Sequence, residues 1–185
     1  MKLSKNYQYH ILCEDAQSRS FINATLSDQG ISARKVFCNS IPCGKGCGEV
    51  AVRRGFPKEI RRLKATSYNK QVLIVCTDAD KYTIDERKAF LDKEVISQGL
   101  KWDKQQDPIM IWIPKRQIET WIHALNQEDV DENMVFPHLG KPVSCKKQAK
   151  KFSQYCQNLI ELEPPALDSI IESKNEYNRI CGLQK

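Results

Sequence analysis

The chain has 185 residues, of which 41% are hydrophobic and 28% are charged, and its formal net charge is +6. No uninterrupted apolar stretch approaches the roughly 20 residues that cross a bilayer, and residues 1–6 lack the apolar core of a signal peptide. We therefore expect a cytoplasmic protein with no membrane association. The length suits one sizeable hydrophobic core. We expect an α/β domain over residues 1–135 and a helical C-terminal extension over residues 136–185, packed on that domain.

Short apolar runs alternate with helical patterns along the chain, which predicts an α/β sheet. We expect strands over residues 7–13, 31–38, 71–77 and 108–113, and helices over residues 18–29, 83–97 and 116–126. A further helical stretch follows the glycine-rich loop 44–48, with a break at Gly55 and a restart at Pro57. The sequence of the tail predicts two helices, over residues 144–159 and 165–181. The expected fold is an open, mainly parallel sheet of about four strands, flanked by helices and followed by a helical C-terminal tail.

The cysteines are expected to be reduced. Cys13 and Cys76 end predicted buried strands, where cysteine behaves as a small hydrophobic residue. Cys38, Cys43 and Cys47 lie within ten residues of each other, but the second pair of ligands that a structural zinc site uses is missing.

Two aspartates follow the most apolar run of the chain, residues 71–76, in the sequence Thr77-Asp78-Ala79-Asp80. Ligands of open α/β sheets collect at the carboxyl ends of such strands. Because strand side chains alternate, Asp78 and Asp80 can point the same way and offer hard oxygen ligands to Mg²⁺ or Mn²⁺. An Asp-rich turn that only ends the strand fits the same residues.

Other acidic and basic residues are expected at the same edge of the sheet. Glu14 follows the first strand, and Glu119 lies in the first turns of the helix behind the fourth. Carboxylates gathered there would repel one another unless a cation bound among them, although single acids at helix starts also serve as caps. Lys81 and Lys115, beside the third and fourth strand ends, could stabilise negative charge in a transition state.

Basic residues after the second strand suit contacts with nucleic-acid phosphates. Lys58, Arg61 and Arg62 share one helical face, and we expect this basic stripe at the same rim as the acids. A solvated helix face explains such a stripe equally well. The glycines around Lys45 let backbone N–H groups approach an anion. The candidate nucleic-acid contacts are Lys45, Arg53, Arg54, Lys58, Arg61 and Arg62.

Three features together resemble the Toprim-type metal-binding fold, over roughly residues 7–125: an acid after the first strand, Asp-x-Asp after the third, and an apolar-Glu-x-Trp helix start after the fourth. The resemblance extends weakly to residues 164–167 and 176–177 of the tail. The first motif of this family is typically Glu-Gly, whereas Asp15 follows Glu14 here and Ser18 stands near the expected second acid. The number of bound metal ions, one or two, therefore remains open.

The resemblance implies a Mg²⁺-dependent nuclease that acts on DNA or RNA, as the effector of a prokaryotic defence or mobile-element system. Glu14, Asp78, Asp80 and Glu119 would be the metal ligands, with Glu14 alternatively acting as general base and Glu119 alternatively orienting a bound water. Two other functions stay open. One is a regulatory or adaptor subunit that works with an ATPase, and the other is a non-catalytic module that binds nucleic acid through its basic faces.

Overall fold

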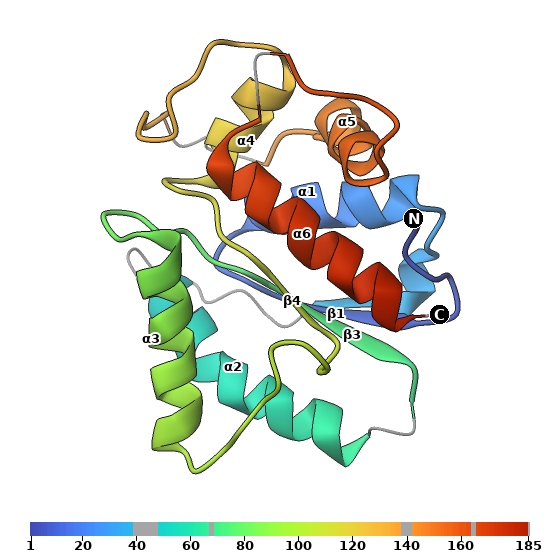
Figure 1. The fold of residues 1–185 in the computed structure, drawn as a ribbon, viewed down its shortest axis with the longest axis vertical. Helices are drawn as coiled ribbons and strands as arrows, with labels where there is room; N and C mark the ends of the chain where they lie inside the picture. Colours follow the sequence, from blue (N-terminus) through green and yellow to red (C-terminus); the bar gives the residue numbers. More distant parts are fainter. Residues whose placement is uncertain (39–47, 67–68, 138–141, 164–165, 185) are drawn as a thin grey trace.

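A four-stranded parallel sheet forms the centre of the molecule (Figure 1). The structure is a computed structural model that describes residues 1–38, 48–66, 69–137, 142–163 and 166–184. The strands are β1 (Gln8–Cys13), β2 (Val36–Cys38), β3 (Gln71–Cys76) and β4 (Ile109–Trp112), in the order β2-β1-β3-β4. All three pairings are parallel. The α/β fold class expected from the sequence is confirmed.

Helices cover both faces of this sheet. The helices α1 (Ala16–Asp28), α4 (Ile118–Leu125), α5 (Lys146–Cys156) and α6 (Asp168–Leu183) cover one face, and α2 (Gly48–Ala65) and α3 (Ile84–Ser97) cover the other (Figure 1). Strand alternation explains the two layers, because Ile74 and Cys76 belong to the first hydrophobic cluster while Leu73 and Val75 belong to the second. Residues 72–76 are apolar throughout because both faces of this strand are buried.

Two segments differ from the sequence-based expectation. A short 3₁₀ turn, Ala33–Lys35, lies within the expected second strand 31–38, so β2 begins only at Val36 and has three residues. Helix α2 runs without a break through Gly55 and Pro57. Its apolar face packs on the sheet, and this burial outweighs the roughly 3 kcal/mol that an internal proline costs. Gly55 serves a close approach instead, since a Cβ there would lie 3.3 Å from Cδ1 of Leu12.

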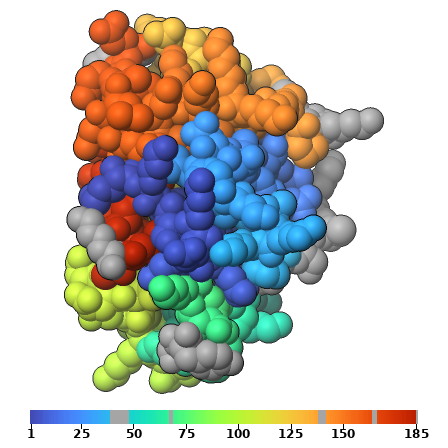
Figure 2. Space-filling model, turned by 90° about the vertical axis from the view of Figure 1, so that its right-hand side faces the viewer, coloured from blue at the N-terminus to red at the C-terminus, as the bar shows by residue number. Residues whose placement is uncertain are grey.

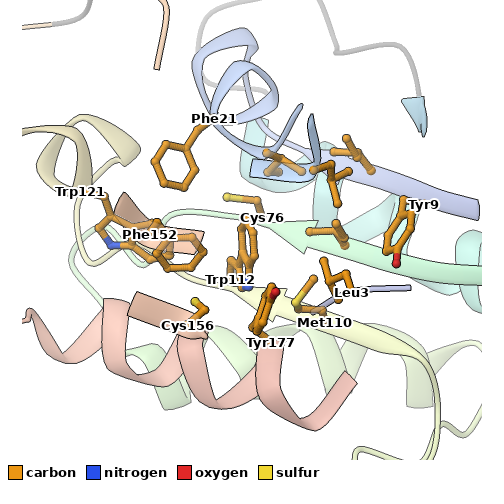
Figure 3. Close-up of a cluster of buried hydrophobic side chains, with 14 of the residues drawn as sticks. Leu3, Tyr9, Phe21, Cys76, Met110, Trp112, Trp121, Phe152, Cys156 and Tyr177 are labelled. Carbon is orange, nitrogen blue, oxygen red and sulfur yellow. The ribbon is translucent and has the colours of Figure 1, made fainter. Parts of the chain in front are cut away.

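The C-terminal helices share the core of the sheet. The ring centroid of Phe152, in α5, lies 5.1 Å from that of Trp112 and 5.7 Å from that of Trp121 (Figure 3). The indole N–H of Trp121 donates to Oγ of Ser169 in α6 at 2.9 Å. In the space-filling view, α5 lies directly against α1 (Figure 2). Residues after 142 therefore complete the hydrophobic core of the sheet rather than forming a second one.

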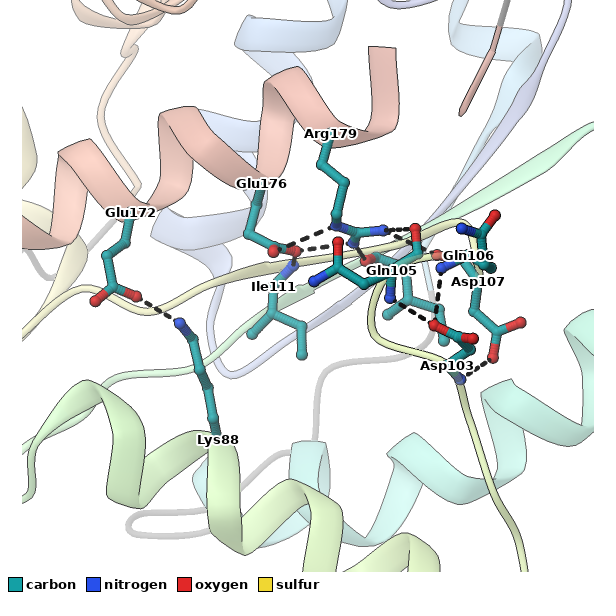
Figure 4. A network of polar contacts seen from close by, with 10 residues as sticks. Lys88, Asp103, Gln105, Gln106, Asp107, Ile111, Glu172, Glu176 and Arg179 are labelled. Atoms are coloured by element: carbon teal, nitrogen blue, oxygen red, sulfur yellow. Dashed lines mark hydrogen bonds and ion pairs between the residues drawn. The ribbon is translucent and has the colours of Figure 1, made fainter. Parts of the chain in front are cut away.

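Helix α6 also contacts the outer strand β4 through polar groups (Figure 4). Arg179 donates to the carbonyl oxygens of Gln105 at 3.3 Å, Asp107 at 3.2 Å and Ile109. A carboxylate oxygen of Glu176 accepts from the N–H of Ile111 at 3.3 Å. Of the helices in the described ranges, none is long and apolar enough to cross a membrane.

Candidate acidic site at the carboxyl edge of the sheet

The candidate site lies between the carboxyl ends of β1 and β3. These neighbouring strands lead away in opposite directions, because the chain passes from β1 through α1 to β2, and from β3 through α3 to β4. Open α/β sheets bind their ligands outside the strand ends at such a divergence. Glu14 follows β1 directly, and Asp78 follows β3 by two residues.

Glu14 bridges the two strand ends. Its Oε1 accepts hydrogen bonds from the hydroxyl of Thr77 and, at 2.8 Å, from the N–H of Asp78. Burial raises the pKa of Glu14 to about 7, against the lowering effect of these two hydrogen bonds and with a smaller raising effect from Asp80. A Cβ at Gly48 would lie 2.9 Å from Cβ of Glu14, so only glycine lets α2 begin this close to the carboxylate.

Asp78 experiences the strongest crowding of negative charge. Burial raises its pKa well above the usual value, and the charges of Glu14, Asp15, Asp80 and Glu119 raise it further, in that order. The N–H of Thr77 donates to Trp112 at 3.2 Å, so strand-like pairing continues past Cys76. Alternation then directs Asp78 to the side of the sheet that α1 and α4 cover.

Asp80 does not point the same way as Asp78, contrary to the expectation from their spacing. Its backbone is left-handed, with φ of 56°, which ends the alternation. Its Oδ2 accepts from Arg87 of α3 at 3.1 Å, on the opposite side of the sheet. The Arg87 side chain is buried and also pairs with Glu49 at 2.8 Å. This ion-pair network, centred on Arg87, holds Asp80 in its exposed position.

The structure thus brings all four predicted acids to one edge, where they straddle the sheet. Glu119 is buried, 4% exposed, in the first turn of α4, and its charge contributes to the raised pKa of Asp78. In the described part of the chain, no group of three or more His, Cys, Asp or Glu side chains is arranged to hold a metal ion. Carboxylate oxygens fit Mg²⁺ or Mn²⁺ chemically. Side-chain rotation, above all of Asp80 away from Arg87, would be needed to close them around an ion.

Two of the predicted basic residues lie on the loops at this edge. The ammonium of Lys115 donates to the carbonyl oxygen of Tyr82 at 2.5 Å, and that of Lys81 lies 5.4 Å from the centroid of the Tyr82 ring. Arg53, near the start of α2, is paired with Glu49 at 3.0 Å and with Glu94 at 2.7 Å. Arg54 is exposed on the same helix. The predicted contact at position 45 lies outside the described residues.

The basic stripe formed by Lys58, Arg61 and Arg62 lies at the opposite edge of the sheet, so its expected place beside the acids is wrong. Arg62 donates to Oε1 of Gln71, the first residue of β3, at 2.6 Å. Since α2 begins beside Glu14 and rises about 1.5 Å per residue, Arg62 lies about 21 Å along the helix from Gly48. Helix α2 runs antiparallel to the strands, so only its first turns approach the acids.

Sequence reasoning missed three residues that shape the site: Thr77, Arg87 and, as a cap, Asp15. Oδ1 of Asp15 accepts from the N–H of Ser18 at 2.7 Å and caps α1, which the spacing Asp-x-x-Ser could have indicated. Thr77 lies within the recognised motif, but no rule of spacing assigns it to Glu14. Arg87 follows Asp80 by seven residues across a turn, and no local pattern signals their contact.

The fold and the site define a class of protein: an open parallel α/β sheet with closely spaced carboxylates at its carboxyl edge. Comparison of the chain with protein-family models, with curated proteins and with solved structures gave no match.

Proposed function

We propose that this chain is a Toprim-like, divalent-cation-dependent nuclease that hydrolyses phosphodiester bonds of DNA or RNA. The observation that supports the proposal most is the crowding of carboxylates around Asp78, whose pKa is raised by burial and by four neighbouring acids. A protein gains nothing in stability from such crowding by itself. A bound cation would offset the repulsion and would account for the placement of these acids at the topological switch point.

Glu14, Asp78, Asp80 and Glu119 are the residues that would hold Mg²⁺ or Mn²⁺. When bound, the cation would neutralise negative charge on the scissile phosphate. Alternatively, Glu14 would act as the general base that takes a proton from the attacking water; its pKa of about 7 in the cation-free protein suits that role only where Glu14 does not itself ligate the cation, whose charge would lower the pKa. Lys81 and Lys115, on the loops at the same edge, would stabilise the additional charge of the phosphate in the transition state.

The test is a cleavage assay on labelled single-stranded DNA, double-stranded DNA and RNA, with EDTA, Mg²⁺ and Mn²⁺ arms. The variant is Asp78→Asn, and the matched control is Asp129→Asn, which changes an exposed aspartate of a loop. We expect cleavage only with a cation, its loss in Asp78→Asn and its retention in Asp129→Asn. Equal cleavage by the two variants, or no cation binding by calorimetry in the unmodified protein, would overturn the proposal.

A further inference from the structure

Three thiols meet at the carboxyl ends of three neighbouring strands. Cys13 of β1 is in register with Cys76 of β3, and Cys38 of β2 is in register with Ile11, two residues before Cys13. Residues in register, or two apart on one strand, point to the same face of a sheet. All three thiols therefore lie on the face that α1 covers, and all three are free of disulfides.

Cys38 differs from the other two thiols in its access to solvent. Cys13 and Cys76 are buried, whereas Cys38 is partly exposed at the end of the outer strand β2. It lines a groove of about 560 Å³ between α1 and the segment that leads into β2. Arg19 and Asn23 of α1 line the same groove, so a reagent that enters the groove meets a thiol and a guanidinium together.

The neighbours of Cys38 stabilise its ionised form. The interaction with the neighbouring thiol of Cys13 lowers the pKa of Cys38 to about 7 against the raising effect of burial. The positive charge of Arg19 and a hydrogen bond from its guanidinium lower it further. The same thiol–thiol interaction, with burial, raises the pKa of Cys13, whose thiol donates to the carbonyl oxygen of Asp15 at 3.5 Å. Cys38 is therefore the more nucleophilic thiol of the two.

We propose that Cys38 is a modification site, at which small anionic disulfides react by thiol–disulfide exchange and leave a mixed disulfide in the Arg19 groove. The Cys38 thiolate attacks one sulfur of the reagent and forms a new S–S bond. The S–S bond of the reagent breaks, and its other half leaves as a thiolate, which solvent protonates only where its own pKa lies above the pH. The retained half carries a carboxylate that Arg19 can pair with, which selects anionic over neutral reagents. This inference does not depend on the proposed nuclease function.

The test follows the reaction of the full chain with the dianionic disulfide DTNB and with neutral dithiodipyridine. Cys43 and Cys47 are first replaced by serine, so that the label can be assigned among the other six cysteines. With a pKa of about 7 against about 8.5 for free cysteine, and allowing for the weaker nucleophilicity of a low-pKa thiol, we expect Cys38 to react about fivefold faster than free cysteine near pH 6.5. Peptide mass spectrometry should place the first label on Cys38.

Two further variants distinguish a specific reaction at Cys38 from the unselective labelling of any exposed cysteine. Cys38→Ser should remove the fast phase, and Arg19→Gln should slow DTNB severalfold more than it slows dithiodipyridine. Circular dichroism checks that each variant is folded, and if Cys38→Ser does not fold, the position of the first label in the parent protein decides the matter. A first label on another cysteine, or an unchanged ratio of the two rates in Arg19→Gln, would overturn the proposal.

Discussion

Replacing Glu14 by glutamine should make the cation-free protein more stable at alkaline pH and leave it unchanged at acid pH. The reason is the environment of the carboxyl group, whose pKa burial raises from 4.5 to about 7 in the folded state. A group with a raised pKa in the folded protein favours folding when it is protonated. Its contribution is complete below pH 4.5 and is lost as the pH rises through about 7.

The size of the effect follows from the same shift. One pKa unit corresponds to about 1.36 kcal/mol, so the rise from 4.5 to about 7 corresponds to roughly 3 kcal/mol lost by the unmodified protein across this interval. Glutamine stays neutral, and its carbonyl oxygen can still accept the hydrogen bonds from Thr77 and from the N–H of Asp78. The variant therefore keeps the contacts without the cost of ionisation.

Urea unfolding in EDTA, measured from about pH 4 to pH 8, tests this expectation. The free-energy difference between Glu14→Gln and the unmodified protein should grow from near zero to about 3 kcal/mol. Glu163→Gln, at an exposed position, is the control and should show no such trend. A difference that is constant with pH, or that favours the unmodified protein at pH 8, would show that the reasoning about the partly buried Glu14 carboxyl is wrong.

Three other perturbations test the site and the core. Asp78→Asn should raise the unfolding temperature in EDTA at pH 8, by about 2–4 °C per kcal/mol for a chain of this size, and should remove the stabilisation that Mg²⁺ gives; a lower unfolding temperature would contradict the crowding of charge. Lys115→Glu should weaken nucleic-acid binding and lower the slope of log affinity against log salt concentration by roughly 0.7–0.9, while Lys58→Glu with Arg61→Glu should change neither quantity. Filter binding at several salt concentrations measures both, and a larger effect of the double variant than of Lys115→Glu would contradict the prediction. Phe152→Ala, at a fully buried position, should cost about 3–5 kcal/mol by urea unfolding; a cost near zero would mean that the tail does not complete the core.

The strands β1, β3 and β4 and the gathering of the acids were predictable, because both follow from local patterns, whereas β2 is shorter than its apolar pattern indicates. An apolar run such as residues 72–76 can only be buried, and acids that follow parallel strands must share one edge. What happens at Asp80 was not predictable, since its left-handed backbone and its bond to Arg87 depend on how α3 packs. The basic stripe failed for a related reason. The sequence correctly predicts that these three residues share one helical face. Which end of the sheet this face lies beside depends on where α2 begins, and local sequence does not determine that.

The contacts of Arg179 and Glu176 with β4 carry a consequence for how the chain folds. An outer strand with unsatisfied backbone groups is a template for pairing with another chain, and α6 supplies the side chains that bond the carbonyl oxygen of Ile109 and the N–H of Ile111 in β4. Helix α6 follows β4 by more than fifty residues in the chain. During synthesis this strand therefore emerges several seconds before the helix that covers it. Until then the nascent sheet is exposed to pairing with other chains, and a truncation before residue 168 would make that vulnerable state permanent.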